Sequence, residues 1–243
     1  MRAWIGGLLV AAMLAGCTTY EVAAPVPQPV QVAEVRAAAP VLPPREAARN
    51  FVGAVDRVQP VAEAFCRART RGIPCAFRIV IDDRPGQPPN AFQTLDRAGR
   101  PVLGFTVALI ANARNIDEIA FVMGHEAAHH ILGHLPLTEE NAAAGAILAG
   151  VLASLGGADA AAVRAAQNVG ATVGARRYSR EFELQADALG AEIALAAGFD
   201  PLLGAAFFDR LPDPGDRFLG SHPRNADRSA VVRQTVARLR AGG

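Results

Sequence analysis

The sequence predicts an α+β fold, a mostly helical domain with one small antiparallel sheet in its first half. Three patterns predict it: apolar stretches with helical spacing after residue 115, alternating β-branched residues at 76–81, and two short apolar runs that flank a turn. A proline-rich segment precedes all of these elements. We therefore expect one globular domain over 49–243, which is long enough to bury a sizeable core.

The first sixteen residues have the features of an export signal. A positively charged start is followed by an apolar run at 4–15, which is too short to cross a bilayer. The run leads into Leu14-Ala15-Gly16-Cys17, which resembles the signal of bacterial lipoproteins. The resemblance implies cleavage before Cys17 and a lipid attached to it; an ordinary secretory peptide with an incidental cysteine is the alternative. By resemblance to the sorting rule of Gram-negative lipoproteins, Thr18 in place of Asp favours the outer membrane, on its periplasmic face.

Composition excludes several classes of protein. Residues 17–48 are rich in Pro and Ala, which is typical of an extended linker that holds a domain away from a membrane. The net charge is +1, lysine is absent, and no basic run indicates a nucleic-acid partner. No segment after the export signal has the length and hydropathy expected of a membrane span.

The domain is expected to begin with a helix over 51–70, interrupted near Pro60. Cys66 and Cys75 are an even pair once Cys17 carries a lipid, and exported proteins meet an oxidising compartment. We expect them to form a disulfide, which closes a short loop and would add on the order of 2–3 kcal/mol. Two free buried thiols are the alternative.

A small sheet is predicted next. Residues 76–81 alternate and are β-branched, whereas 83–90 contain three prolines and a glycine and should form a loop. The runs 91–95 and 102–106 can pair as a hairpin across the turn at 96–99. An edge strand of such a sheet can bind an extended peptide through its backbone.

An apolar helix is predicted from residue 116 onward. Asn115 at the N-cap and Glu118 three residues later resemble a capping box, and Gly133 with Pro136 should end the helix. Most side chains between 119 and 132 are apolar, so the helix should be buried.

This helix contains the run His125-Glu126-Ala127-Ala128-His129. Residues four apart share a helix face, so both imidazoles can reach one metal ion while Glu126 lies beside it. A hydrolytic zinc site needs this combination: two neutral nitrogen ligands and a carboxylate that takes a proton from metal-bound water. A chance pattern with a structural role is the alternative, but buried imidazoles and a buried Glu are costly without a compensating cation.

A catalytic zinc site needs a third protein ligand, and a helix predicted at 179–194 offers one. Glu183 and Asp187 are four residues apart and share a face. Glu183 can therefore bind the metal, one Zn²⁺ per chain, while Asp187 accepts a hydrogen bond from a ligating histidine. The alternative is a solvated face on which the carboxylates pair with Arg180 or Arg176.

Residues 141–175 are rich in Ala and Gly, and their only charges are those of Asp159 and Arg164. Two closely packed helices, split at Gly156-Gly157, are predicted there. The pair would either cover the cleft as a mobile lid or pack into the core, and the sequence favours neither.

The two motifs together resemble a known family. His125-Glu126-x-x-His129, followed about fifty residues later by Ser179-Arg180-x-x-Glu183-x-x-Ala186-Asp187, is similar to the gluzincin metallopeptidases of the HtpX and CAAX-prenyl-protease type. The resemblance covers roughly 91–228 and is nearest to the periplasmic lipoprotein branch that includes BepA and LoiP. It implies a zincin-like metallopeptidase domain, with His125, His129 and Glu183 as zinc ligands and Glu126 as general base.

Members of that family also carry a His-Pro pair after the third-ligand helix, here His222-Pro223. His222 can donate a hydrogen bond to a tetrahedral oxyanion, or it can occupy the open coordination position of the metal; a loop histidine that caps a helix is the alternative. Tyr178 is a weaker candidate for the oxyanion contact. His130 and His134 lie on the far side of the helix and are expected to be structural.

The residues predict a zinc-dependent peptidase with Glu126 as general base, and the resemblance implies an endopeptidase that hydrolyses misfolded or unassembled envelope proteins in the periplasm. Its partners would be unfolded protein substrates and the membrane, through the lipid at Cys17. The chain departs from the family at Gln185, where many members carry a second Glu, but this is not a ligand position. An outer-membrane assembly factor or chaperone with a latent or self-inhibited protease site is the alternative.

Overall fold

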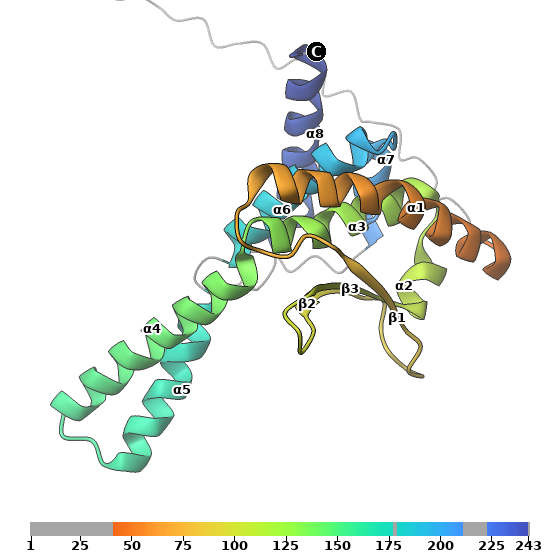
Figure 1. Cartoon of the computed structure of the whole chain (residues 1–243). Helices are drawn as coiled ribbons and strands as arrows, with labels where there is room; N and C mark the ends of the chain where they lie inside the picture. The colour runs from red at the N-terminus through yellow and green to blue at the C-terminus, as the bar shows by residue number, and fades with distance from the viewer. Residues whose placement is uncertain (1–40, 177–178, 211–222, 243) are drawn as a thin grey trace, which may run out of the picture. The chain divides into compact units, whose positions relative to one another are not determined.

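The described part of the chain, residues 41–176, 179–210 and 223–242 of the computed structural model, begins with a long helix (Figure 1). This helix, α1 (Pro44–Arg69), packs against the metal-motif helix and starts inside the predicted linker. The expected interruption at Pro60 is wrong, because a buried stripe on both sides of the proline holds the helix together despite the lost backbone hydrogen bond. That stripe consists of Ala47, Phe51, Ala54, Val58, Ala62 and Cys66.

A disulfide joins the last turn of α1 to the segment that enters the sheet. Cys66 and Cys75 are bonded, with their Cα atoms 5.6 Å apart. Gln59 Nε2 also donates a hydrogen bond of 2.9 Å to the Phe77 carbonyl. The start of the first strand is therefore tied to α1 at two points.

The three strands form a mixed sheet in the order β1-β3-β2. β2 (Ala91–Leu95) and β3 (Pro101–Thr106) pair antiparallel as the predicted hairpin. β1 (Arg78–Asp82) pairs with β3 in parallel, so the expectation of a wholly antiparallel sheet is wrong. The reason is that the loop at 83–90 carries the chain past the position of β3 to the far edge before the hairpin returns it. β2 is consequently an edge strand.

Two helices follow the sheet, α2 (Val107–Asn112) and α3 (Ile116–Ile131). Asn115 Oδ1 caps α3 by accepting a hydrogen bond of 2.9 Å from Glu118 N. The reciprocal half of the predicted capping box is replaced, because the Glu118 carboxylate accepts from Arg114 N and pairs with Arg210. α3 is buried on nearly every side, as its apolar sequence predicts, and packs against α1, α6 and α7.

Gly133 ends α3 with a left-handed backbone, φ +69°. Pro136 follows the end of α3, as expected, and lies in the first turn of the next helix, α4 (His134–Leu155). There its missing N–H costs nothing, because the first-turn amides of a helix have no partner within the helix. α5 (Ala160–Arg176) runs back along α4 after a turn at Gly156-Gly157, as predicted.

The α4–α5 hairpin is not part of the core. Within these two helices only His134, Gly150 and Gly170 are buried, so the core alternative is wrong. The hairpin packs mainly on itself, and its other contacts are concentrated where α4 meets α3 and α5 meets α6 (Figure 1).

The remaining helices close the domain around α3. They are α6 (Ser179–Ala196), α7 (Pro201–Ala205), a short 3₁₀ helix (Phe208–Arg210) and α8 (Asn225–Ala241). α6 lies against α3 and α8 against α6. Among the helices of the described ranges, none has the length and hydropathy to cross a membrane.

A glycine contact sets the distance between α3 and α6. A Cβ atom added at Gly124 would lie 2.7 Å from the Gly190 carbonyl oxygen, and one added at Gly190 would lie 2.8 Å from His125 N. The backbones of the two helices therefore touch, at a separation that larger side chains would prevent. The two sequence motifs meet across this contact.

Candidate metal centre

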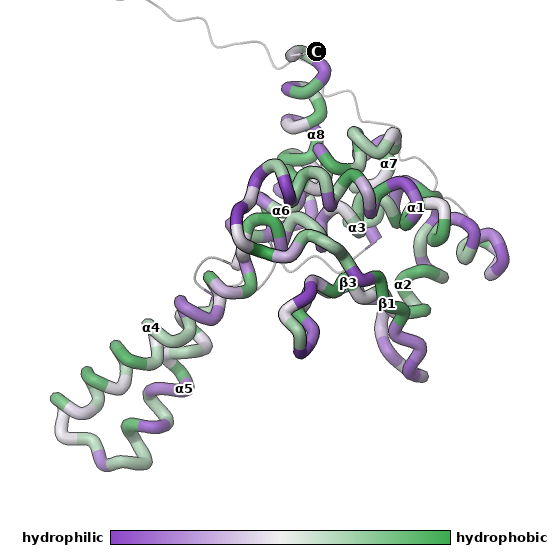
Figure 2. Tube along the Cα trace, in the orientation of Figure 1, coloured by the Kyte–Doolittle hydropathy of each residue, from purple (hydrophilic) through white to green (hydrophobic). Residues whose placement is uncertain are grey.

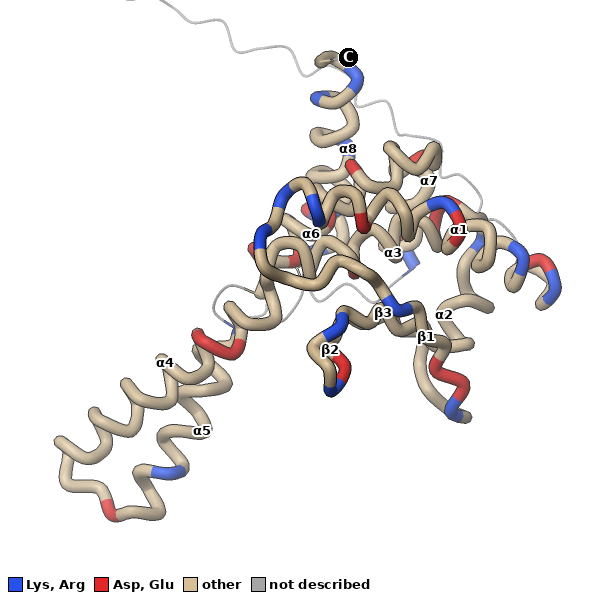
Figure 3. Tube along the Cα trace, in the orientation of Figure 1, with Lys and Arg blue, Asp and Glu red and all other residues tan. Residues whose placement is uncertain are grey.

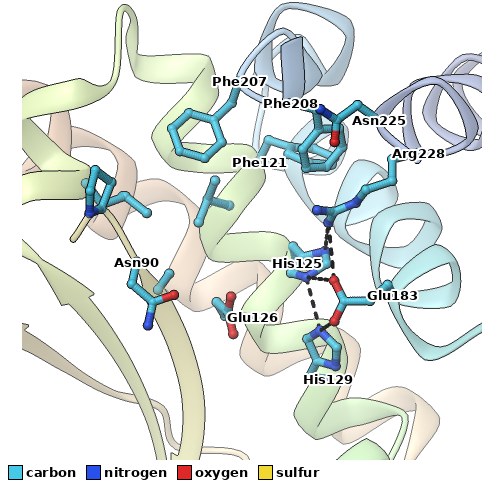
Figure 4. Close-up of a pocket in the computed structure, with 14 residues that line it drawn as sticks. Asn90, Phe121, His125, Glu126, His129, Glu183, Phe207, Phe208, Asn225 and Arg228 are labelled. Atoms are coloured by element: carbon cyan, nitrogen blue, oxygen red, sulfur yellow. Dashed lines mark hydrogen bonds and ion pairs between the residues drawn. The ribbon is translucent and has the colours of Figure 1, made fainter. Parts of the chain in front are cut away.

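Three predicted ligand side chains converge between α3 and α6 (Figure 4). His125 Nε2 and His129 Nε2 are 3.0 Å apart, and the two Glu183 oxygens lie 3.6 Å and 3.4 Å from these nitrogens, respectively. Ligand atoms around a tetrahedral ion with bonds of about 2.0–2.1 Å would lie about 3.3–3.4 Å apart. The donor set therefore fits a divalent cation, and it is the one such His, Cys, Asp or Glu group found in the described residues.

Asp187 orients the first histidine, as the sequence predicts. His125 Nδ1 lies 2.9 Å from Asp187 Oδ1, so with Nε2 turned to the metal site Nδ1 carries the proton and donates it. Asp187 is fully buried, which acts to raise its pKa, but hydrogen bonds from His125 and Arg228 outweigh burial and hold the pKa below its usual value. The carboxylate is therefore anionic and fixes the His125 tautomer.

Arg228 from α8 is a functional residue that the sequence analysis missed. Its Nε and Nη2 donate to the two Asp187 oxygens at 2.8 Å and 2.7 Å, and Nη2 lies 3.5 Å from Glu183 Oε2. The guanidinium lies 3.7 Å from the centre of the Phe208 ring. The alternative of a solvated Asp187 paired with a nearby arginine of its own segment is therefore wrong. No motif distinguishes this residue among the 24 arginines of the chain.

Glu126 lies beside the donor group and points into the cleft (Figure 4). Burial raises the pKa of Glu126, while the neighbouring His125 and His129 act in the opposite direction. A carboxylate with a raised pKa binds a proton more readily at neutral pH. Its position and its basicity both suit a proton acceptor.

His134 was expected to be structural, but it contacts a ligand histidine. His134 Nδ1 is 2.9 Å from His129 Nδ1, and His134 Nε2 is 3.1 Å from Gln185 Oε1. One proton arrangement satisfies both contacts: His129 Nδ1–H donates to His134, and His134 Nε2–H donates to Gln185. This leaves the His129 Nε2 lone pair turned to the metal site. Burial lowers the pKa of His134 to about 4, which keeps its ring neutral for this role.

His130 has the structural role that was expected. Its Nε2 lies 2.8 Å from the Pro74 carbonyl, and its ring packs edge-on against Phe77. His222, Tyr178 and Cys17 lie outside the described residues, so their predicted roles remain predictions.

Two hollows meet at the donor group. One is a cleft of about 430 Å³ whose lining includes Asn90, Phe121 and Phe207. The other, of about 260 Å³, includes Gln93 and, at the base of the hairpin, Thr138. Glu126, His129 and Glu183 line both, and the edge strand β2 borders both.

The sequence profile of peptidase family M48 matches residues 55–236, which is 182 of the 243 residues. The chain belongs to peptidase family M48. The match includes both ligand helices, the edge strand and Arg228. A comparison with curated proteins found no match.

M48 members are zinc-dependent metallopeptidases, so this M48 peptidase is a hydrolase of that class. The His125, His129 and Glu183 side chains are the ones that fit the family's metal. The predicted resemblance to HtpX-type metallopeptidases and the α+β, mostly helical fold class are both confirmed.

Proposed function

We propose that this M48 peptidase is a zinc-dependent endopeptidase that cleaves unfolded or misassembled envelope proteins in the bacterial periplasm. The observation that carries the proposal is the position of Glu126. Its carboxylate lies beside three metal-ligating donors, at the point where two hollows meet along an edge strand.

Endopeptidase action requires room for the substrate on both sides of the scissile bond. The two hollows provide that room, because each extends from Glu126 in its own direction past a different part of β2. The unpaired edge of β2 can pair with the backbone of an extended peptide. Hydrogen bonds to the substrate backbone depend little on its side chains, which suits a protease that cleaves unfolded segments of varied sequence.

The catalytic roles follow from the contacts. A zinc ion held by His125, His129 and Glu183 supplies a Lewis acid and a water whose pKa is lowered towards neutrality. Glu126 accepts the proton of the attacking water and returns it to the leaving amine. Asp187 and His134 lie within hydrogen-bond distance of the Nδ1 atoms of the two ligand imidazoles, so that Nδ1 carries the proton and each Nε2 lone pair is turned to the site.

Arg228 balances charge around these groups. Two carboxylates, of Asp187 and Glu183, lie in a largely buried region, and such charges are costly without a partner. The guanidinium lies within 3.5 Å of both. It therefore stabilises the anionic form of the ligand and of the residue that orients His125.

The location belongs to the same proposal. The sequence at 14–17 resembles a lipoprotein signal and supports a lipid at Cys17, on the periplasmic side of the outer membrane. The disulfide between Cys66 and Cys75 supports an oxidising compartment, because such bonds persist there and are rare in the cytosol.

The test uses the mature chain without its lipid, loaded with zinc. We expect it to cleave casein and also a peptide blocked at both ends, which only an endopeptidase can cut. Glu126→Gln should keep its zinc, measured by native mass spectrometry, and lose cleavage. Glu140→Gln, an exposed change of the same kind on α4, should cleave like the wild type.

Three results would contradict the proposal. Cleavage retained by Glu126→Gln would remove its role as proton acceptor. An uncut blocked peptide beside degraded casein would indicate an exopeptidase. Casein left intact by zinc-loaded wild type would favour the alternative of an assembly factor.

A further inference from the structure

The α4–α5 hairpin has its small residues inside and its large residues outside. Between 142 and 155, every α4 residue that is buried or half-buried is Ala or Gly. A Cβ atom added at Gly145 would lie 2.1 Å from the Gly170 carbonyl oxygen, and one added at Gly174 would lie 2.1 Å from the Asn141 carbonyl oxygen. The two helices are therefore in backbone contact, and no large side chain fits between them there.

Between 141 and 155 the large aliphatic side chains of α4 all lie on its outer face, which we call the α4 stripe. Its members recur at helical spacing and are 51–81 % exposed: Ile147, Leu148, Val151, Leu152 and Leu155. No charged residue occurs between 141 and 155 (Figures 2 and 3). A helix pair that meets only water would bury such residues, because each exposed Leu or Ile forgoes roughly 1.5–3 kcal/mol of transfer free energy.

The outer face of α5 has a different character. It exposes Arg164 and the polar residues Gln167, Asn168 and Thr172, and two valines lie among them. The hairpin is therefore amphipathic as a unit, with an apolar side formed by α4 and a mixed side formed by α5.

We propose that the α4 stripe lies in the interfacial region of a lipid bilayer, with its aliphatic side chains among the acyl chains and α5 turned to water. Close contact through Gly and Ala with large aliphatic side chains pointing outward is the way helices pack in lipid. Residues 141–155 would measure about 22 Å as a helix, which is less than the ~30 Å of a hydrocarbon core. The helix therefore lies in the interface and does not cross it.

The composition of the α4 stripe favours a lipid surface over a protein partner. Protein docking sites are centred on Trp, Tyr or Arg side chains that fill pockets. The α4 stripe has none of these and is a smooth row of Ile, Leu and Val. Acyl chains require no specific partner atoms, so such a row suits them.

The segment before α1 also supports contact with a membrane. This step rests on the proposed lipid at Cys17, not on the peptidase activity. Residues 18–43 separate that cysteine from α1, and an extended proline-rich chain of this length reaches up to about 80 Å. A lipid on a tether fixes distance but not orientation, so the α4 stripe would supply the second contact that orients the domain.

The test is flotation with vesicles of phosphatidylethanolamine and a minority of phosphatidylglycerol. The protein is the mature chain exported by a non-lipoprotein signal, with Cys17→Ser so that no lipid is attached. We expect it to float with the vesicles, also at high salt, because the contact is apolar. Leu148→Glu with Leu152→Glu should lower the bound fraction at least tenfold.

The matched control places the same number of charges on α5. Val169→Glu with Val173→Glu changes residues that are 64 % and 43 % exposed, and it should leave the bound fraction within twofold of the parent. Glu is a good helix former and all four positions are exposed, so both variants should keep the wild-type circular dichroism and zinc content.

Two outcomes would overturn the inference. The first is a lipid-free chain that does not float. If that chain instead forms a dimer, detected by light scattering, which the α4 variant abolishes, a second copy covers the stripe. The second outcome is equal loss of binding in the α4 and α5 variants. Casein cleavage by the same samples is read separately, so failure here leaves the peptidase proposal standing.

Discussion

Gly190→Ala is expected to weaken metal binding by moving α6 away from α3. The new Cβ atom would lie 2.8 Å from His125 N and 2.9 Å from His125 Cα, and backbone atoms cannot rotate aside. Ordinary contact begins at 3.4 Å, so relief of the 2.8 Å contact requires a shift of about 0.6 Å. Glu183 lies two turns earlier on α6 and moves with it.

The size of that shift decides the effect. Metal–ligand distances tolerate about 0.2 Å, so a displacement of about 0.6 Å takes the Glu183 carboxylate out of range of the two histidines. We expect a loss of zinc affinity of at least tenfold. Overpacking should also cost roughly 1–3 kcal/mol of unfolding free energy, offset by about 1 kcal/mol of improved helix propensity.

Competition with a chromogenic zinc chelator measures the affinity, and thermal unfolding with and without zinc measures the stability. Gly53→Ala is the matched control, because its Cβ meets only the flexible end of Ile116, at 3.3 Å. It gains the same helix propensity and should bind zinc like the wild type. A folded Gly190→Ala protein with unchanged zinc affinity would refute the argument from the helix contact.

Two further predictions concern the residues that support the ligands. Arg228→Met should lower the unfolding free energy by about 3–5 kcal/mol in urea, because it removes the arginine that is paired with the buried Asp187 carboxylate and leaves only the hydrogen bond from His125; an unchanged midpoint would contradict this. His134→Phe should keep the ring stacked on Phe182 but lower zinc affinity about tenfold, because a ligand histidine loses its acceptor. His130→Phe is its control, and equal losses in both variants would argue against a specific role for His134.

Each half of the metal centre could be predicted from the sequence because its geometry lies within one helix, whereas the meeting of the two halves depends on the contact between Gly124 and Gly190. His125 and His129 share a helix face at a spacing of four, and Glu183 and Asp187 repeat this on α6. The boundaries of α3 are likewise set by single residues: Asn115 caps its first turn, and Gly133 adopts the left-handed backbone that ends it. Each of these features depends on neighbours within one turn of helix.

The features that the sequence did not predict depend on contacts between segments that are distant in the chain. Arg228 reaches Asp187 across 41 residues, and His134 meets Gln185 across 51. The parallel pairing of β1 depends on which edge of β3 is open after the hairpin forms. Pro60 stays within α1 because packing of the helix outweighs its local preference. No periodicity or residue spacing in the sequence predicts these contacts and pairings.

The junction where the α4–α5 hairpin leaves the domain has a consequence for how this protein can be altered. The backbones of Asn141 and Gly174 touch there, so the roughly thirty residues between them leave the domain and return to it at the same place. The catalytic helices take their spacing from the Gly124–Gly190 contact and not from those residues. We therefore expect that the length and surface of the segment between Asn141 and Gly174 can be changed, for example to suit a different membrane or partner, without changing the geometry of the metal centre.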